Sequence, residues 1–347
     1  MPSVFVRLGG FGWEWARNNY PWTNVYGLGR SLLAFGTALT LTFNTSNILF
    51  RPAAGVPECP YCRDISHFSI FCVFSGHLEV VRFVSVIVLL IVASGWRPRY
   101  TAFFHWWVSF SFQTAAITLD GGDQVTAVLT LLILPIACTD RRKWHWQSIP
   151  WGRHPNTIEV LRRLTALITL SVIRFQVAII YFHALIGKLN VDDWVNGTVL
   201  YYWFTDPTIG LPAWLSGLTP LLTTRLVVVL TWATLLLEAA LFMALIMPKS
   251  ARKYWLVAGI VFHSLIAISM GLVSFAIAMF AALVLYLQPF DEEFGFWFLA
   301  KLAKRDRSRE NESTANLESG ELREYPAPVN ALQDRAVSHL VYSSRCP

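Results

Sequence analysis

Charged side chains are scarce in this sequence. Asp, Glu, Lys and Arg make up 14% of the 347 residues, whereas hydrophobic residues make up 54%. Water-soluble domains of this length carry about a quarter of their residues as charged side chains. The shortage of charge therefore argues against a soluble enzyme and predicts an integral membrane protein whose surface mostly faces lipid.

Several sequence patterns are also missing. Residues 1–20 are interrupted by Arg7, Glu14 and Arg17 and contain no apolar core followed by small residues, so we expect no cleavable signal peptide. The net charge of +6 is accompanied by no nucleic-acid-binding motif, and we expect no nucleic-acid partner. The five cysteines include no second Cys or His pair at zinc-site spacing, so we expect no metal centre.

Long apolar runs are what the sequence does contain. About 20 helical residues cross roughly 30 Å of hydrocarbon, and eight runs come close to that length. They predict an all-α fold, a polytopic membrane bundle of about eight transmembrane helices, with a hairpin break at Met270-Gly271. The runs cover residues 27–50, 79–96, 99–119, 124–140, 164–187, 225–247, 254–270 and 273–289.

Basic residues in the short connections predict the orientation of the spans. The side that is richer in Lys and Arg faces the cytoplasm, and with an even number of spans we expect both termini there. That side holds Arg7, Arg17, Arg30, Arg97, Arg99, Arg141, Arg142, Lys143, Arg153, Arg162, Arg163, Lys249, Arg252 and Lys253, against Arg51, Arg63, Lys188 and Arg225 on the other.

Three regions follow from this pattern. Residues 1–24 interleave Trp and Tyr with charge, which is typical of an interfacial segment. Residues 25–290 form the transmembrane domain, and we expect its connection 189–224, rich in Trp, Leu and turn residues, to lie on the outer membrane surface. Residues 291–347 have few large apolar side chains after residue 303, so we expect a cytoplasmic, largely disordered tail.

Ionisable side chains inside the spans are the first candidates for a functional site. Each costs about 2.5 kcal/mol or more in hydrocarbon unless it has a partner or a function. The candidates are His105, Arg174, His183, Glu238 and His263.

The third span has one polar stripe. His105, Ser109, Gln113 and Asp120 fall within an arc of about 80° on a helix, so we expect this face to contact protein.

The fifth span has two polar stripes. Arg174, Tyr181 and Lys188 recur every seven residues, and Gln176 and His183 point to the opposite face. A helix that is polar on both faces is most simply the central helix of the bundle, and we expect this one to be surrounded by the others.

Structural roles compete with functional ones at these positions. Arg174 and Glu238 both lie near mid-membrane, and the simplest interpretation is that they form a structural ion pair. A lone histidine such as His105 or His183 more often makes one interhelical hydrogen bond than takes part in catalysis. Lys188 either extends to water at the membrane boundary or acts as a base in a pocket of low dielectric.

The segment between the third and fourth spans has a similar ambiguity. Gly121 suits the position after a helix and Asp123 the N-cap of the next one. A binding role for Asp120 and Asp123 would need a third ligand, which the spacing does not identify.

Three cysteines lie in the external connection 51–78. We expect a structural disulfide among Cys59, Cys62 and Cys72, and the alternative is a redox-active dithiol made by the C-x-x-C pair Cys59 and Cys62. Cys138 and Cys346 would face the cytoplasm and stay reduced.

Several blocks spread over roughly residues 20–290 resemble the SdpB family, the membrane components of sporulation-delaying-type antimicrobial peptide systems. The resemblance implies a multi-pass protein of the cell membrane that works with a partner called SdpA to mature or activate a secreted peptide toxin from its precursor. The blocks are PWTNVYGLGRSLLAFGTALTLTFN, ASGWRPRYTAFFHWWVSFS, DGGDQV, TDRRKWHW and YFHALIGKLNVDDWVNGTVLYYW.

The blocks RFQVAIIYFHALIGKLNVDDWVNGTVLYY and GIVFHSLIAISMGLVSFAIAMF are also distantly similar to the membrane part of vitamin K-dependent γ-glutamyl carboxylase, in the HTTM superfamily. On that match Lys188 falls on the lysine base that deprotonates vitamin K hydroquinone, and His263 on a histidine of the family's F-H block. The resemblance implies a membrane cavity for a quinone-like cofactor or a peptide segment. The carboxylase's large lumenal domain has no counterpart here, which argues against carboxylation itself and leaves another peptide-modifying reaction open.

We therefore expect a toxin-maturation factor with an external-facing cavity inside the membrane. The alternatives are a non-enzymatic peptide exporter or chaperone, and a quinone- or disulfide-linked oxidoreductase that uses Cys59 and Cys62. The candidate catalytic residues are Lys188, His263, Glu238, His105 and His183, and the candidate cavity residues are Arg174, Tyr181, Gln113, Asp120 and Asp123.

Overall fold

The computed structural model describes residues 4–52, 55, 59–147, 155–207 and 210–290, all within one compact unit, Met1–Phe294. The expected tail 291–347 lies outside these residues. The described chain is helical throughout, and its only β pairing is an isolated bridge between Trp96 and Trp144. The sequence-based prediction of an all-α fold is thereby confirmed.

Eight long helices lie on the eight apolar runs. They are α2 (Asn24–Phe43), α5 (Leu78–Ser94), α6 (Pro98–Ala115), α7 (Gly121–Thr139), α8 (Thr157–Leu189), α11 (Arg225–Met243), α12 (Lys249–Met270) and α13 (Val273–Leu287). The shorter helices are α1 (Val4–Asn18), α3 (Ser46–Leu49), α4 (Ile70–Val73), α9 (Asp192–Val195), α10 (Val199–Thr205) and the 3₁₀ segments η1 (Asp64–Phe68), η2 (Ser75–His77) and η3 (Ala213–Thr223).

Five helical segments among the described residues are long and apolar enough to cross a membrane. These are Ser75–Ser94, Gly121–Thr139, Thr157–Leu189, Arg225–Met243 and Lys249–Met270. Helix α13 is apolar but has 15 residues. The helices α2 and α6 carry more polar side chains, which lowers their mean hydropathy.

Two boundaries have clear local causes. Helix α12 ends at Gly271, whose φ of 73° is a left-handed conformation that glycine adopts without strain, so the predicted break of the last hairpin is confirmed. Helix α2 ends at Phe43, seven residues before its apolar run ends. Arg82 of α5 donates hydrogen bonds to the carbonyl groups of Leu41 and Thr42, and these bonds satisfy the last turn of α2.

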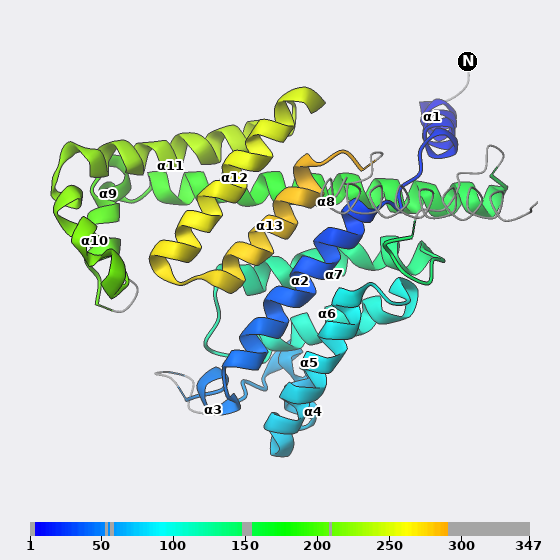
Figure 1. Cartoon of the computed structure of the whole chain (residues 1–347). Coiled ribbons are helices and arrows are strands. Elements are labelled where there is room, and N and C mark those ends of the chain that lie inside the picture. The colour runs from blue at the N-terminus through cyan, green and yellow to red at the C-terminus, as the bar shows by residue number, and fades with distance from the viewer. Residues whose placement is uncertain (1–3, 53–54, 56–58, 148–154, 208–209, 291–347) are drawn as a thin grey trace, which may run out of the picture. The chain divides into compact units, whose positions relative to one another are not determined.

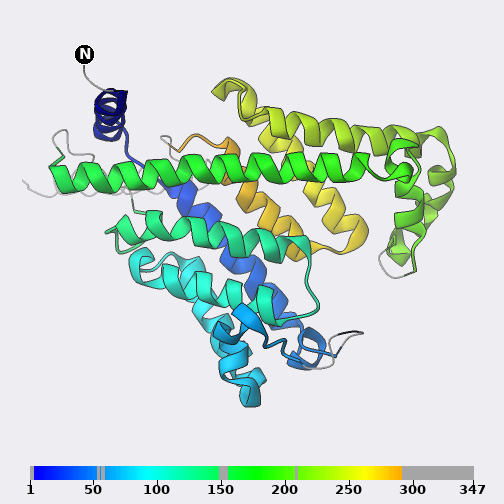
Figure 2. The same ribbon diagram turned by 180° about the vertical axis from the view of Figure 1, so that it is seen from behind.

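Helix α8 is the longest element (Figures 1 and 2), with 33 residues. Asn156 caps its start by accepting a hydrogen bond from the Glu159 N–H at 2.8 Å. Helix α1 packs near the N-terminal end of α8, where Ala16 is buried against Val160 and Leu167. Helices α9 and α10 lie at the C-terminal end of α8.

The central helix is α13, not α8 as its polar stripes predict. Almost every residue of α13 from Ala276 to Leu287 is buried. Its neighbour α2 approaches closely because Gly29 and Gly36 face Leu285 and Ile277. The face of α8 that carries His183 is exposed instead, so the prediction that α8 is surrounded on all sides is wrong.

Two apolar cores form on either side of α2. One joins α2 to α7, α8 and α11–α13, and the other joins it to α5 and α6. The first core includes Tyr181, and a smaller cluster of Trp194, Val199 and Leu235 packs against Leu185 near the C-terminal end of α8.

Candidate functional site

A partly buried ion pair joins α8 to α11. The ammonium group of Lys188 lies 2.6 Å from Glu238 Oε1, and the side chain of Glu238 is only 6% exposed. Lys188 occupies the last turn of α8, whereas Glu238 lies 13 residues into α11. The contact gives each charge a partner, with the carboxylate shielded from bulk water and the lysine side chain 21% exposed.

A hydrogen bond between a phenol and an imidazole lies two helical turns before Lys188 on the same face of α8. The Tyr181 hydroxyl and His263 Nε2 are 3.1 Å apart, and both side chains are buried. Seven residues separate Tyr181 from Lys188, which corresponds to about 10 Å along the helix. One face of α8 thus supports four polar groups, contributed together with α11 and α12.

Two atoms of this cluster have unused hydrogen-bonding capacity. Glu238 Oε2 and His263 Nδ1 are buried and make no hydrogen bond within the described part of the chain. Buried polar atoms are normally satisfied, so a polar group of a bound molecule or an ordered water fits here. The cluster combines a carboxylate, an ammonium group and an imidazole, which are groups that accept and donate protons.

Trp194 of α9 covers the ion pair. The Lys188 ammonium lies 5.2 Å from the centre of the Trp194 ring, within the range of a cation–π interaction. Trp194 in turn packs edge to face against Trp203 of α10, with ring centres 5.6 Å apart. The connection 189–224 thus contacts the cluster directly.

Arg174 does not pair with Glu238, and that prediction is wrong. Its guanidinium donates a hydrogen bond of 2.9 Å to the Gln288 carbonyl and lies over the Phe290 ring. Lys188 is the partner of Glu238 because α11 packs against the C-terminal end of α8, where Lys188 lies. Spacing along one helix cannot show which part of a neighbouring helix it meets.

The other candidate histidines lie outside the cluster. His183 is exposed and lies edge to face against its neighbour Phe182. His105 and Ser109 are buried on α6, as the polar stripe predicts, and Gln113 follows on the same helix. His105 Nε2 and Gln113 Oε1 make no hydrogen bond within the described residues.

Asp120 and Asp123 form a helix cap. Helix α6 ends at Ala115, so Asp120 is not part of the third-span stripe. Asp120 is the N-cap of α7, in place of the predicted Asp123, and accepts hydrogen bonds from the N–H groups of Gly122 and Asp123. Asp123 accepts one from the Asp120 N–H, and Ser274 donates to Asp120 at 3.1 Å. These bonds give both carboxylates a structural role.

The cysteines of the connection 51–78 form one disulfide, between Cys62 and Cys72. Cys59 lies outside it, with its thiol 3.1 Å from the Arg51 carbonyl oxygen. Burial raises the pKa of the Cys59 thiol, which disfavours the reactive thiolate. The C-x-x-C pair is therefore not joined in this structure.

A second polar network escaped the sequence analysis, which assigned its basic residues to topology alone. Asp140 binds the Arg142 guanidinium at 2.8 Å and accepts a hydrogen bond from the Tyr26 hydroxyl at 2.7 Å. Nearby, Arg30 is fully buried and donates to Thr101 at 2.6 Å. The block TDRRKWHW, in which four charged residues are followed directly by Trp-His-Trp, is the signal that indicates a folded loop.

His145 belongs to this network. Its Nε2 lies 3.2 Å from the Ser31 hydroxyl, and its ring packs against Gly27 and Gly95. Burial, together with the positive charges of Arg30 and Arg142, lowers the pKa of His145 to about 2. The imidazole is therefore neutral and acts as a packed core group.

Buried Arg82 was also missed. It donates a hydrogen bond of 2.7 Å to Glu79, whose other carboxylate oxygen accepts from the Ser46 N–H. Together with its bonds to the end of α2, this fixes α5 against the α2–α3 junction.

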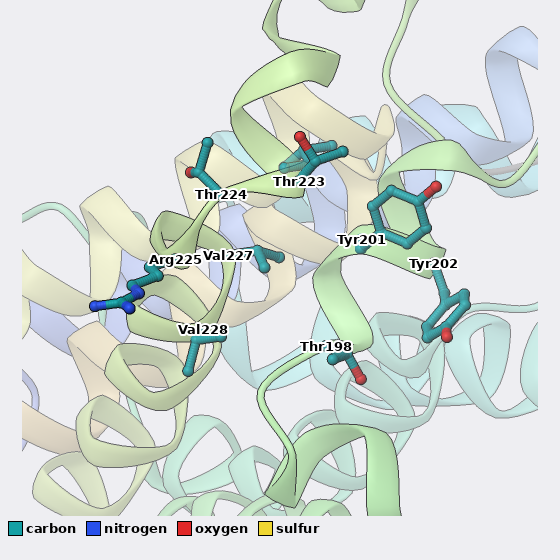
Figure 3. Close-up of a pocket in the computed structure, with 9 residues that line it drawn as sticks. Thr198, Tyr201, Tyr202, Thr223, Thr224, Arg225, Val227 and Val228 are labelled. Carbon is teal, nitrogen blue, oxygen red and sulfur yellow. The ribbon is translucent and has the colours of Figure 1, made fainter.

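A pocket of about 460 Å³ lies where α10, the end of η3 and the start of α11 meet. Figure 3 shows the tyrosines of α10 on one side and the valines of α11 on the other. Its main lining residues are Thr198, Tyr201, Tyr202, Thr223, Val227 and Val228.

The sequence is similar to two proteins of Bacillus subtilis (strain 168). Uncharacterized protein YitO is 40% identical over 304 residues, which cover 86% of this chain and 96% of that protein. Sporulation-delaying protein SdpB is 37% identical over 270 residues, which cover 78% of this chain and 82% of that protein. No family model matches the sequence, and no solved structure matches it.

Proposed function

The chain belongs to the SdpB-like family, and on this basis we propose that it matures or activates a secreted antimicrobial peptide toxin in the cell membrane. An SdpA-like protein would be its partner and the toxin precursor its substrate. The proposal includes eight transmembrane helices, with both termini in the cytoplasm. Five apolar helices support the membrane location.

The main observation in favour of a reactive site is the Lys188–Glu238 ion pair. A carboxylate that is only 6% exposed and a lysine 2.6 Å away, both on apolar helices, are costly to hold together, and a functional requirement accounts for that cost. The adjacent Tyr181–His263 pair adds a second exchangeable proton. In the proposal these four groups form the external-facing cavity in which the precursor is modified.

The carboxylase resemblance gives Lys188 the role of a base. Glu238 then acts as a positioning residue that would take a proton from the Lys188 ammonium group, so that the neutral amine can accept the proton of the substrate. The quinone-like cofactor that the resemblance implies would be held by Lys188 and His263, and it would supply redox chemistry when bound. The unused Nδ1 of His263 fits a polar group of such a molecule.

Mass spectrometry of the secreted peptide tests the proposal. Cells carrying Lys188→Ala or Glu238→Gln should release little peptide, or a peptide whose mass differs from the mature form by the missing modification. Lys253→Ala removes an exposed lysine of α12 and should leave the product unchanged. Normal mass and yield from Lys188→Ala would instead favour the non-enzymatic exporter or chaperone.

Labelling from outside the cell tests the proposed orientation. In a Cys59→Ser, Cys138→Ser and Cys346→Ser background that keeps the Cys62–Cys72 disulfide, Trp214→Cys in the exposed η3 segment should react with a membrane-impermeant maleimide. Lys143→Cys, which lies in the exposed loop after α7, should react only after the membrane is opened. Reaction of both positions in intact cells would overturn the topology.

A further inference from the structure

The pocket between α10, η3 and α11 has a chemistry of its own. Leu222, Val227 and Val228 make one side of the pocket aliphatic, and threonine and tyrosine side chains add hydroxyl groups around it. None of its described lining residues is acidic, and the one basic residue, Arg225, points away from the tyrosines in Figure 3. Such a surface suits an uncharged occupant that is apolar but can also form hydrogen bonds.

The hydroxyl groups distinguish a peptide from a lipid chain. A peptide segment presents N–H and C=O groups that pair with the hydroxyls of Thr198, Tyr201 and Thr223, whereas an acyl chain has none. Tyrosine and tryptophan side chains, such as Tyr201, Tyr202 and Trp203 of α10, are also typical of the membrane–water boundary. The pocket would therefore meet a peptide at the membrane surface.

The pocket connects to the buried ion pair in two ways. Helix α11 forms its wall through Val228 and carries Glu238 ten residues later, about 15 Å along the axis. Trp203 of α10 packs on Trp194, which lies over the Lys188 ammonium. An extended peptide covers about 15 Å with five residues, so one chain can occupy both places at once.

We infer that this pocket is the binding site for an uncharged, apolar segment of the peptide substrate, which it holds about five residues away from the residue that reaches Lys188. The inference rests on the proposed function and adds the substrate class and the specificity determinant to it. It predicts that affinity depends on the pocket, whereas the modification depends on the ion pair.

A defined probe tests binding directly. The full chain, in nanodiscs of phosphatidylglycerol and phosphatidylcholine, is titrated against a dye-labelled, end-capped twelve-residue peptide of leucine and threonine, with fluorescence anisotropy as the readout. Val228→Trp fills the pocket and should weaken binding by at least about tenfold. Val229→Trp is the matched substitution, since Val229 is 62% exposed and does not line the pocket, and it should leave binding unchanged.

Two further measurements guard against a folding defect. Tyr202→Ala removes a half-exposed wall residue and should also weaken binding, while the melting temperature stays at that of the unaltered chain. Replacing the two central residues of the probe with lysine should reduce binding, because the pocket has no acidic residue. Equal affinities for Val228→Trp and Val229→Trp, or photocrosslinking of phospholipid instead of peptide from position 202, would overturn the inference.

Lys188→Gln separates this inference from the proposed function. It should abolish the modification in cells and leave probe binding within about twofold, since the pocket is about 15 Å away. Normal modification by Lys188→Gln, with pocket-dependent binding intact, would refute the proposed function alone. Lost modification with pocket variants that bind normally would refute the pocket alone.

Discussion

Tyr181 of α8 and His263 of α12 share a buried hydrogen bond of 3.1 Å, although 82 residues separate them along the chain. The bond joins α8 to α12, whereas the Lys188–Glu238 pair joins α8 to α11. Helix α8 also contacts α7, α11 and α13, so the bond lies among the helices that form the first core.

Tyr181→Phe should lower the free energy of unfolding by about 1 kcal/mol, since it removes the hydrogen bond and leaves His263 without its partner. Thermal unfolding in detergent measures the effect. Tyr254→Phe changes a tyrosine that is 68% exposed, and this variant should unfold at the same temperature as the unaltered chain. Equal melting temperatures for both variants would show that the bond contributes nothing.

The Lys188–Glu238 pair predicts strong energetic coupling. Lys188→Met alone leaves a buried carboxylate unpaired and should cost about 3 kcal/mol. The double variant Lys188→Met with Glu238→Leu should recover much of that loss, because neither charge then remains. A double-mutant cycle from denaturant unfolding gives the coupling, and strictly additive losses would argue against the pair.

His145 should make the protein less stable in acid. Its pKa in the folded protein is about 2, while an unfolded histidine titrates near 6.5. The contribution of the neutral His145 ring to the free energy of unfolding is therefore fully present above pH 6.5. As the pH falls below that value, only the unfolded state takes up the proton, and stability drops by roughly 1.4 kcal/mol per pH unit until the pH approaches 2.

Unfolding measured between pH 7 and pH 5 in the unaltered chain and in His145→Asn isolates this contribution, since other titrating groups affect both alike. The unaltered chain should show the steeper loss. Parallel curves would mean that the ring is accessible to protons in the folded state.

Gly95 should not tolerate a side chain. It has a φ of 89°, and an added Cβ would lie 2.5 Å from the His145 ring. Gly95→Ala should cost about 1–3 kcal/mol, through backbone strain and displacement of His145. Gly76→Ala has no atom within 4 Å of the new methyl group and should be nearly neutral. The melting temperatures of the two variants make the comparison.

Variants of the cysteines distinguish a structural role of the disulfide from a redox role of Cys59 and Cys62. Cys72→Ser opens the Cys62–Cys72 bridge and should destabilise the external segment by about 2–3 kcal/mol. Cys59→Ser should leave toxin maturation intact, because Cys59 lies outside the bridge. Loss of maturation with normal protein levels in Cys59→Ser would support the oxidoreductase alternative.

Helix positions were predictable because they follow from local properties. Apolar runs and the Gly271 break locate α12 and α13 to within a few residues. The end of α2 was not predictable in this way, since Arg82 of another helix satisfies its last carbonyl groups. The same applies to the TDRRKWHW loop, whose Asp140 and His145 bond to Tyr26 and Ser31, 114 residues earlier in each case.

Composition and the order of apolar runs were enough to predict a helical membrane protein and to mark Glu238 and His263 as unusual, whereas Lys188 was singled out by the carboxylase resemblance. Which of these groups meet depended on how the helices pack, because a contact such as Lys188–Glu238 is set by the relative height of α8 and α11. Periodicity reports the direction in which a side chain points around its own helix. It carries no information on how far one helix is shifted along another, and that shift gave Glu238 a lysine in place of Arg174.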